Sequence, residues 1–279
     1  MTRRFAQLDV FASEPLSGNP LAVLLDGDEL STEQMQRITD WTNLSEATFL
    51  LPPTDPAADY RVRIFCPGRE LPFAGHPTLG SCAAWLAAGG VPAAGETIVQ
   101  ECGAGLISIR RDGDRLAFAA PPLVRSGPID SKVLAERLEQ LGLEPEQVVD
   151  AAWIDNGPGW MGVLLDSADA VLSVPVPGAT LPGFDVGLVG LRPAGSECAV
   201  EVRAFFADAA GSVREDPVTG SLNASVAQWL TESGRLATPY VAAQGERVGR
   251  RGRVHVDASD GRLWIGGRAP IVIEGVLRA

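Results

Sequence analysis

The chain consists mainly of short apolar or alternating segments, separated by turns that are rich in glycine and proline. Short runs with β-branched and aromatic residues between such turns are typical of β-strands. Towards the end of the chain, two such runs at 253–257 and 262–265 flank Asp260-Gly261, which predicts a hairpin. The clearest other strands are predicted at residues 21–25, 60–65, 163–165 and 200–206.

Helical periodicity is found in fewer places. Residues 31–41 begin with Ser31 and Gln34 in capping-box spacing, and residues 131–141 form a second amphipathic stretch. The segments 76–88 and 221–231 are also helix-like but apolar on nearly all sides. A helix of that kind is stable when other elements enclose it, so we expect both to be central helices.

Two short patterns recur at the same separation. Val-Leu-Leu-Asp occurs at 23–26 and 163–166, and Val-Arg-x-Phe at 62–65 and 202–205, so that 163 − 23 and 202 − 62 are both 140. Each Val-Arg strand is followed by an acidic loop, a glycine and an alanine-rich helix that ends in Trp-Leu. Short apolar patterns also recur by chance, but the shared order favours two copies of one unit. The two central helices would then point their N-termini at a common cleft.

Length and charge restrict the classes of function. With 279 residues, of which 46% are hydrophobic, the chain is long enough for one large domain or two ordinary ones. Lys and Arg number 23 against 35 Asp and Glu, a net charge of −12, which argues against nucleic acid as a partner. A small anionic substrate would need a local positive feature, and helix N-termini are the natural candidates.

The sequence predicts a cytoplasmic protein without a metal. The N-terminal apolar run is broken by Gln7 and Asp9, and no apolar stretch is long enough to span a membrane. The cysteines are therefore expected to be reduced thiols, and their spacing matches no zinc pattern. They are Cys66, Cys82, Cys102 and Cys198.

Two helix entries are the first candidates for chemistry. Gly75 and His76 open one central helix, with Pro77 behind them, and Gly220 and Ser221 open the other. Backbone N–H groups at such an entry attract an anion by about 0.3 to 1 kcal/mol. Either motif alone is more often an ordinary cap, whereas a matched pair favours a site that holds a substrate carboxylate.

Three polar residues accompany these entries. His76 at a helix start is expected to stay neutral, which suits proton relay, although a merely structural histidine fits as well. Asp216 beside Pro217 is either a site carboxylate or a turn residue, and its neighbour Glu215 is expected to be solvated. Glu46 lies between a helix and an apolar strand, where a buried carboxyl can take and give a proton, although surface acids are commoner there.

Four ordered motifs resemble those of the PhzF-like family of phenazine biosynthesis, and the likeness extends from Phe5 to the end of the chain. The motifs are Gly-Asn-Pro at 18–20, Asn-x-Ser-Glu at 43–46, Pro-Phe-Ala-Gly-His-Pro-Thr at 72–78 and Glu-Asp-Pro-Val-Thr-Gly-Ser at 215–221. The resemblance implies an α+β, diaminopimelate-epimerase-like fold with two pseudo-symmetric halves, each a mostly antiparallel barrel-like sheet around a central helix. It implies residues 1–122 with 268–279 as one half and 123–267 as the other, with the active site between them.

The resemblance also implies roles for individual residues. Glu46 would be the general acid/base, with His76 and Asp216 as catalytic partners. Substrate-binding roles fall to Asn19, Ser45, Gly75, Gly220 and Ser221. The implied enzyme is a cofactor-independent isomerase, usually a homodimer, that moves a proton on a small dihydroaromatic or amino-acid-like carboxylate.

Two departures from the family pattern put the substrate in doubt. Ala47 stands where threonine is common, and Arg251 stands where proline is common. A two-thiol racemase on the same fold would need cysteines where Gly75 and Gly220 stand, so that alternative fails. A nucleotide enzyme lacks its glycine-rich motifs. A binding or interaction module without turnover stays open, because a fold does not guarantee activity.

Overall fold

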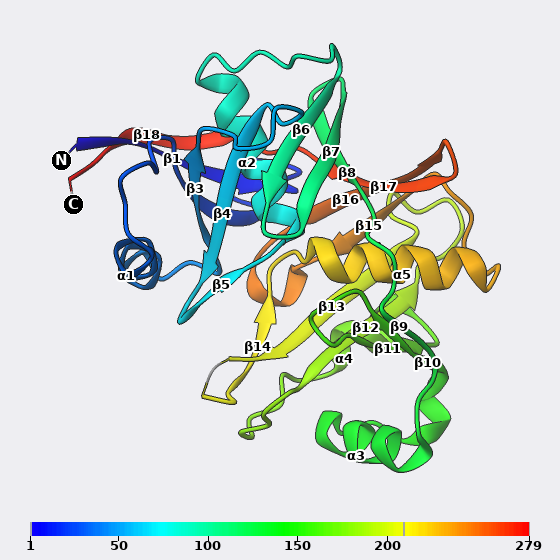
Figure 1. The fold of residues 1–279 in the computed structure, drawn as a ribbon. Coiled ribbons are helices and arrows are strands. Elements are labelled where there is room, and N and C mark those ends of the chain that lie inside the picture. The colour runs from blue at the N-terminus through cyan, green and yellow to red at the C-terminus, as the bar shows by residue number, and fades with distance from the viewer. Residues whose placement is uncertain (1, 209, 279) are drawn as a thin grey trace. The chain divides into compact units, whose positions relative to one another are not determined.

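A computed structural model describes residues 2–208 and 210–278 (Figure 1). The chain divides into two compact units. Unit 1 consists of Met1–Ala119 with Gly266–Ala279, and unit 2 consists of Ala120–Ile265. Both units combine a mostly antiparallel sheet with helices, as the sequence predicts for an α+β fold.

The sheet of unit 1 is ordered β18-β1-β2-β3-β4-β6-β7-β8, with β5 paired to β4. The pairs β2–β3 and β4–β6 are parallel and the others are antiparallel. β1 and β18 run side by side as a long two-stranded ribbon in Figure 1. The strands are β1 (Thr2–Val10), β2 (Asn19–Leu24), β3 (Ala47–Leu51), β4 (Tyr60–Cys66), β5 (Arg69–Leu71), β6 (Thr97–Cys102), β7 (Gly105–Asp112), β8 (Arg115–Ala119) and β18 (Ile271–Arg278).

Unit 2 repeats this scheme with different residues. β10–β11 is antiparallel, β11–β12 parallel, β12–β13 antiparallel and β13–β15 parallel, which matches β1–β2, β2–β3, β3–β4 and β4–β6. The common topology confirms the duplication predicted from the 140-residue recurrence. The strands are β9 (Arg125–Pro128), β10 (Val148–Asp155), β11 (Met161–Leu165), β12 (Asp185–Leu191), β13 (Val200–Ala207), β14 (Val213–Asp216), β15 (Tyr240–Gln244), β16 (Gly252–Ser259) and β17 (Arg262–Gly267).

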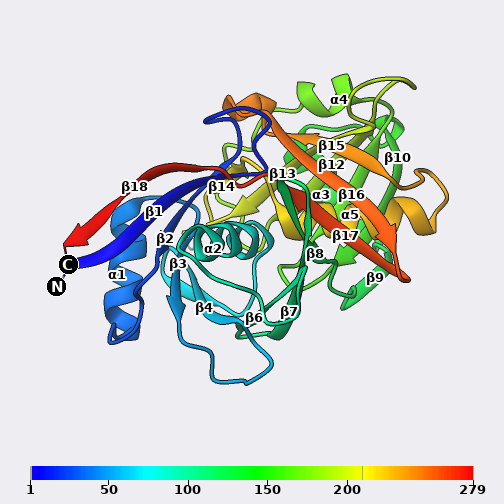
Figure 2. The same cartoon turned by 90° about the horizontal axis from the view of Figure 1, so that it is seen from above.

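Each unit encloses one apolar helix. α2 contacts six strands of unit 1, and Figure 2 shows these strands around it. α5 contacts β10 and β16 of unit 2, and nine of its described residues are buried. The prediction that these two helices are enclosed is therefore confirmed. The helices are α1 (Thr32–Thr42), α2 (Gly75–Ala87), α3 (Ser131–Leu141), α4 (Ala168–Ser173) and α5 (Gly220–Glu232), with 3₁₀ turns η1 (Pro145–Gln147) and η2 (Glu246–Val248).

The remaining helices cover the outer faces of the sheets. α1 begins directly after Ser31, which forms the predicted capping box with Gln34. The helix packs Met35 and Ile38 against Phe49 and its neighbours on β2, β3 and β4. α3 and α4 pack in the same way on the sheet of unit 2. Among the described residues, no helix is long and apolar enough to span a bilayer.

A duplicated ion pair joins β4 to β5 and β13 to β14. Arg63 uses Nε and Nη2 to bind both oxygens of Glu70, and Arg203 binds both oxygens of Glu215 in the same way. Glu215 was expected to be solvated, and this prediction is wrong, because its side chain is only 1% exposed. Burial of the Arg203 guanidinium requires a counter-charge, and Glu215 supplies it.

Candidate active site

Glu46 and His76 come together in unit 1. Glu46 immediately precedes β3 and His76 is the second residue of α2, and Oε2 of Glu46 lies 3.3 Å from Nε2 of His76. Their spacing is fixed by the packing of α2 on β3, where Ser81 donates a hydrogen bond of 2.9 Å to Thr48. Both hydroxyls are fully buried, so this link is shielded from water.

The surroundings keep His76 neutral. Its side chain is 5% exposed, and burial lowers the pKa of the imidazole to about 3. A position in the first turn of a helix also disfavours a positive charge. A neutral imidazole beside a carboxyl can donate a hydrogen bond to the ionised acid or accept one from the protonated acid. The Glu46 side chain is 17% exposed, which leaves it accessible to a ligand.

Both central helices begin with backbone N–H groups that have no partner within the helix. The first hydrogen bond of the α2 ladder runs from Thr78 N–H to Ala74, so the N–H groups of Gly75 and His76 precede the ladder. In α5 the corresponding hydrogen bond runs from the Asn223 N–H to the Thr219 carbonyl, so the N–H groups of Gly220 and Ser221 also precede the ladder. The helix dipole adds partial positive charge at each entry. Each is suited to a carboxylate.

Asp216 is held in place by its own loop. It ends β14, and its Oδ2 accepts a hydrogen bond of 2.5 Å from the hydroxyl of Thr219. The carbonyl of Asp216 accepts one from Gln244, whose amide oxygen also accepts from Thr219 N–H and from Asn223. The side chain of Thr219 therefore binds Asp216 instead of capping α5. Asp216 is half-buried next to the α5 entry.

Two residues that the sequence analysis missed hold Ser221. The indole N–H of Trp160 donates a hydrogen bond of 3.0 Å to Ser221 Oγ, and Asn156 donates one of 2.9 Å to the Ser221 carbonyl. Both belong to the turn between β10 and β11, in which Gly157 and Gly159 adopt positive φ angles of 137° and 107°. The Asn-Gly-Pro-Gly-Trp sequence at 156–160 was the available signal, since such turns commonly carry functional residues.

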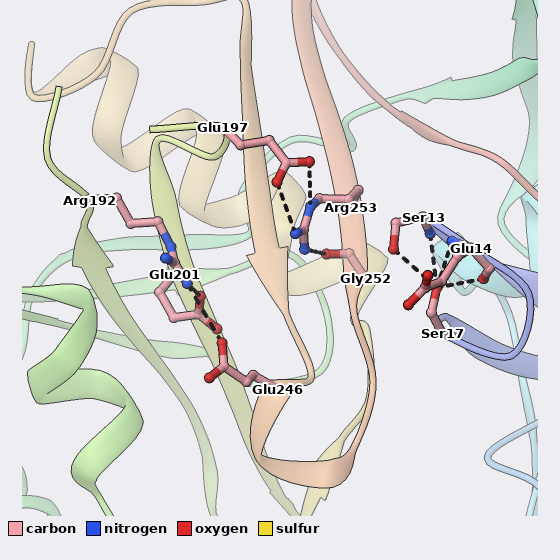
Figure 3. A network of polar contacts seen from close by, with 9 residues as sticks. All are labelled: Ser13, Glu14, Ser17, Arg192, Glu197, Glu201, Glu246, Gly252 and Arg253. Atoms are coloured by element: carbon pink, nitrogen blue, oxygen red, sulfur yellow. Dashed lines mark hydrogen bonds and ion pairs between the residues drawn. The ribbon is translucent and has the colours of Figure 1, made fainter. Parts of the chain in front are cut away.

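The loop before Asn19 explains why the Gly-Asn-Pro motif at 18–20 begins with glycine. Asp9 accepts hydrogen bonds from the backbone N–H groups of Ser17 and Gly18. Figure 3 shows the Ser17 hydroxyl, which accepts from the backbone N–H groups of Ser13 and Glu14. A Cβ atom on Gly18 would overlap the carbonyl oxygen of Val10, so glycine is required there. Asn19 then starts β2 fully buried.

The predicted residues thus fall into two groups. Unit 1 contributes Glu46, His76 and the α2 entry at Gly75, with Ser45 half-buried directly before Glu46 and Asn19 buried on β2. Unit 2 contributes Asp216 and the α5 entry. Among the described residues, no three His, Cys, Asp or Glu side chains gather as they would around a metal ion.

Comparison with known proteins places these groups in context. The sequence-family model of the phenazine biosynthesis-like proteins matches residues 8–275 of this chain. Trans-2,3-dihydro-3-hydroxyanthranilate isomerase of Pseudomonas aeruginosa is 35% identical over 263 residues, covering 91% of this chain and 90% of its own. Antisense-enhancing sequence 1 of Schizosaccharomyces pombe is 34% identical over 297 residues, covering 97% of both chains.

A solved structure of similar fold supports the sequence matches. A predicted epimerase from Pseudomonas aeruginosa superposes with a TM-score of 0.80 at 28% identity, covering 99% of both chains. This likeness, together with the repeated topology of the two units, confirms the fold class expected from the sequence motifs.

Proposed function

This chain belongs to the phenazine biosynthesis-like protein family, and from that premise we propose that it is an isomerase which moves a proton on a small carboxylate-bearing substrate. The single observation that carries the proposal is the contact of 3.3 Å between Glu46 and a neutral, buried His76. A carboxyl in such a pair can act first as a base and then as an acid.

The proposed reaction needs one proton carrier. Glu46 removes a proton from a substrate carbon, so that the C–H bond breaks, an O–H bond forms on Glu46 and the adjacent double bond shifts. Glu46 then returns the proton to another carbon and regains its charge. With its proton on Nε2, the neutral His76 donates a hydrogen bond to a Glu46 oxygen in both protonation states of the carboxyl, and the imidazole keeps its proton throughout. Positioned proton transfer of this kind accelerates a reaction by about 100- to 10,000-fold.

The helix entries would orient the substrate. We assign the N–H groups at Gly75, Gly220 and Ser221 to the substrate carboxylate and Asp216 to a polar group of the substrate. Asn19 and Ser45 are assigned to substrate binding as well. No arginine or lysine is then needed to hold the anion, because backbone donors and helix dipoles supply the positive potential.

The proposed substrate class is supported by the name of one relative. A relative of 35% identity is a trans-2,3-dihydro-3-hydroxyanthranilate isomerase, and we propose a dihydroaromatic or amino-acid-like carboxylate here. We propose that the reaction needs no cofactor, since Glu46 both accepts and returns the proton. We also propose a homodimer, supported by β18, where Val272, Ile273 and Val276 are 42–55% exposed.

The experiment measures how much deuterium from the solvent is incorporated into candidate substrates. The protein is incubated in D₂O with trans-2,3-dihydro-3-hydroxyanthranilate and with related β,γ-unsaturated amino acids, and carbon-bound deuterium is measured by NMR. We expect one of these compounds to incorporate deuterium at a carbon and to shift its double bond. The rate should be unchanged after dialysis against EDTA.

Two results would contradict the proposal. A protein that binds these carboxylates but incorporates no deuterium into any of them is a binding module, the alternative left open by the sequence. Exchange that disappears with EDTA and returns with a metal would remove the cofactor-independent mechanism.

A further inference from the structure

Gln244 on β15 spends its whole side-chain amide on the loop that carries Asp216. The residue is 1% exposed. Its Oε1 accepts from the Thr219 backbone N–H at 3.0 Å and from the Asn223 amide at 2.8 Å. Its Nε2 donates to the Asp216 carbonyl at 3.2 Å and to the Thr219 hydroxyl at 3.0 Å. An amide offers two donors and two acceptor positions, so these four contacts occupy all of them.

The orientation of this amide is fixed by two backbone groups. The N–H of Thr219 can only donate and the carbonyl of Asp216 can only accept, so Oε1 of Gln244 must face the first and Nε2 the second. The reverse orientation would set donor against donor at Thr219 and acceptor against acceptor at Asp216. The second N–H of Gln244 is therefore a donor to the Thr219 hydroxyl.

The Thr219 hydroxyl extends this direction to the Asp216 carboxyl. Its oxygen accepts from Gln244 and lies 2.5 Å from Oδ2 of Asp216. Among the described residues, Oδ2 is the acceptor within hydrogen-bond distance of this hydroxyl, so the hydroxyl proton points to it. An O–H···O contact of this length is typical of an ionised acceptor. The chain of hydrogen bonds thus runs from Gln244 through Thr219 to a carboxylate.

The corresponding glutamine of unit 1 lacks this link. Gln100 on β6 is also buried and donates to Thr78, the fourth residue of α2, as Gln244 binds Asn223, the fourth residue of α5. Its Oε1 accepts from the hydroxyl of Tyr60. Both glutamines hold the first turn of a central helix, but the printed partners of Gln100 include no carboxylate. The link to Asp216 is therefore not required to pack such a helix.

Other charged groups of unit 2 also surround Asp216. Its neighbours on β14, Arg214 and Glu215, each form an ion pair of their own. β13 places an alanine opposite Asp216, and the first turn of α5 carries no acid. The turn after β15 and the start of β16 pack against this loop through glycines, and they carry Glu246, Arg247, Arg250, Arg251 and Arg253. The variants below change none of these groups, so their effect on Asp216 stays constant.

We propose that Gln244 is a positioning residue, which through the Thr219 hydroxyl keeps Asp216 ionised and holds its carboxylate as a hydrogen-bond acceptor for the substrate. This role rests on the proposed function, because Asp216 is assigned there to a polar group of the substrate. A donor aimed at a carboxylate favours the ionised form over the protonated one. Asp216 then accepts from the substrate, and Glu46 is left to carry the proton.

Carbon-13 NMR of protein labelled at the aspartate carboxyl carbons tests this role without a substrate. The Asp216 signal is assigned by its absence in Asp216→Asn, and its titration midpoint is compared in wild type, Gln244→Met and Thr219→Val. We expect the midpoint to rise by about one pH unit in both variants, because a hydrogen bond that favours the charged form is lost or weakened. Thr219→Ser, which keeps the hydroxyl, should titrate like wild type.

Gln100→Met is the matched control from unit 1. It removes a buried amide of the same kind that holds α2, and the Asp216 midpoint should stay at the wild-type value. Unchanged midpoints in Gln244→Met and Thr219→Val would overturn the proposal. An equal rise in Thr219→Ser or Gln100→Met would overturn it as well, because loss of packing would then explain the shift.

Two further measurements complete the experiment. Circular dichroism verifies that each variant is folded, and if Gln244→Met is not, the comparison of Thr219→Val with Thr219→Ser decides. In the deuterium-exchange assay, the acidic limb of the kcat/KM profile should move to higher pH together with the Asp216 midpoint. A shifted midpoint in a protein that exchanges no deuterium would support the hydrogen-bond chain and contradict the isomerase reaction, so the two proposals fail separately.

Discussion

The indole N–H of Trp160 donates a hydrogen bond of 3.0 Å to the hydroxyl oxygen of Ser221 at the entry of α5. Because the oxygen is engaged as an acceptor, the Ser221 hydroxyl proton is left to point to another partner, which we assign to the substrate. Trp160 is therefore a positioning residue.

Replacing Trp160 with phenylalanine should weaken substrate binding more than turnover. Trp160→Phe removes one hydrogen bond, worth about 0.5 to 1.5 kcal/mol, so we expect KM to rise about threefold to tenfold with little change in kcat. Steady-state kinetics measures both. Trp153→Phe is the control, since the Trp153 ring stacks under Arg125 and not on Ser221. Equal effects of both substitutions would reduce Trp160 to a packing residue.

Glu46→Gln should abolish proton transfer. The amide has nearly the shape of the carboxyl but cannot accept a proton, so kcat should fall by about 100- to 10,000-fold while the melting temperature stays close to that of wild type. Deuterium incorporation measures the loss. Glu96→Gln, an exposed acid before β6, should be fully active. Activity above a few per cent in Glu46→Gln would remove Glu46 from this role.

His76 should make stability depend on pH. Its pKa is about 3 in the folded protein against 6.5 for the free side chain, so the unfolded chain binds the extra proton between these values. The free energy of unfolding therefore falls as pH is lowered from 6.5 towards 3, by up to about 1.4 kcal/mol per pH unit from this group. Urea denaturation of wild type and His76→Gln at several pH values measures the difference. Parallel curves for the two proteins would contradict a neutral His76.

Asp216→Asn should slow turnover and alter its pH profile. The Asn oxygen can still accept from Thr219, so the loop is expected to keep its shape while the charge beside α5 is lost. The profile of kcat/KM against pH is the measurement. If the rate falls while the profile is unchanged, Asp216 is a turn residue, the alternative considered from the sequence.

The duplicated ion pairs should differ in strength. Glu215→Gln leaves Arg203 buried with an uncompensated charge, and we expect a loss of about 3 to 5 kcal/mol in the free energy of unfolding. Glu70→Gln alters the matching pair in unit 1, where Glu70 is 40% exposed, and should cost about 0 to 1 kcal/mol. Chemical denaturation compares the two. Similar losses would mean that burial does not determine the strength of these pairs.

Much of the architecture could be predicted because it depends on local patterns. Ser31 and Gln34 form the capping box that their spacing indicates, and the helix predicted at 131–141 is α3 (Ser131–Leu141). Asp260 and Gly261, with φ angles of 52° and 70°, form the turn between β16 and β17, as an Asp-Gly pair predicts. These signals act between residues close in sequence.

The residues whose burial was not predicted are held by contacts with residues far away in the sequence. Val200–Ala207 alternates apolar and charged residues at its start, which normally indicates one solvated face, yet both faces of β13 are covered and Glu201 and Arg203 are buried. Glu215 was expected in solvent as the neighbour of Asp216, but it is buried against Arg203. The contact of Glu46 with His76, thirty positions apart, was suggested by family resemblance and not by periodicity.

The route of the chain through its two units has a consequence for synthesis on the ribosome. Ala120–Ile265 is continuous, whereas unit 1 takes its last strand, β18, from beyond it, and β18 is an antiparallel neighbour of β1. At roughly 5 to 20 residues per second, β1 emerges on the order of ten seconds or more before this neighbour exists. The later unit in the sequence is therefore the first that can be completed, and the earlier one must wait with an open sheet edge.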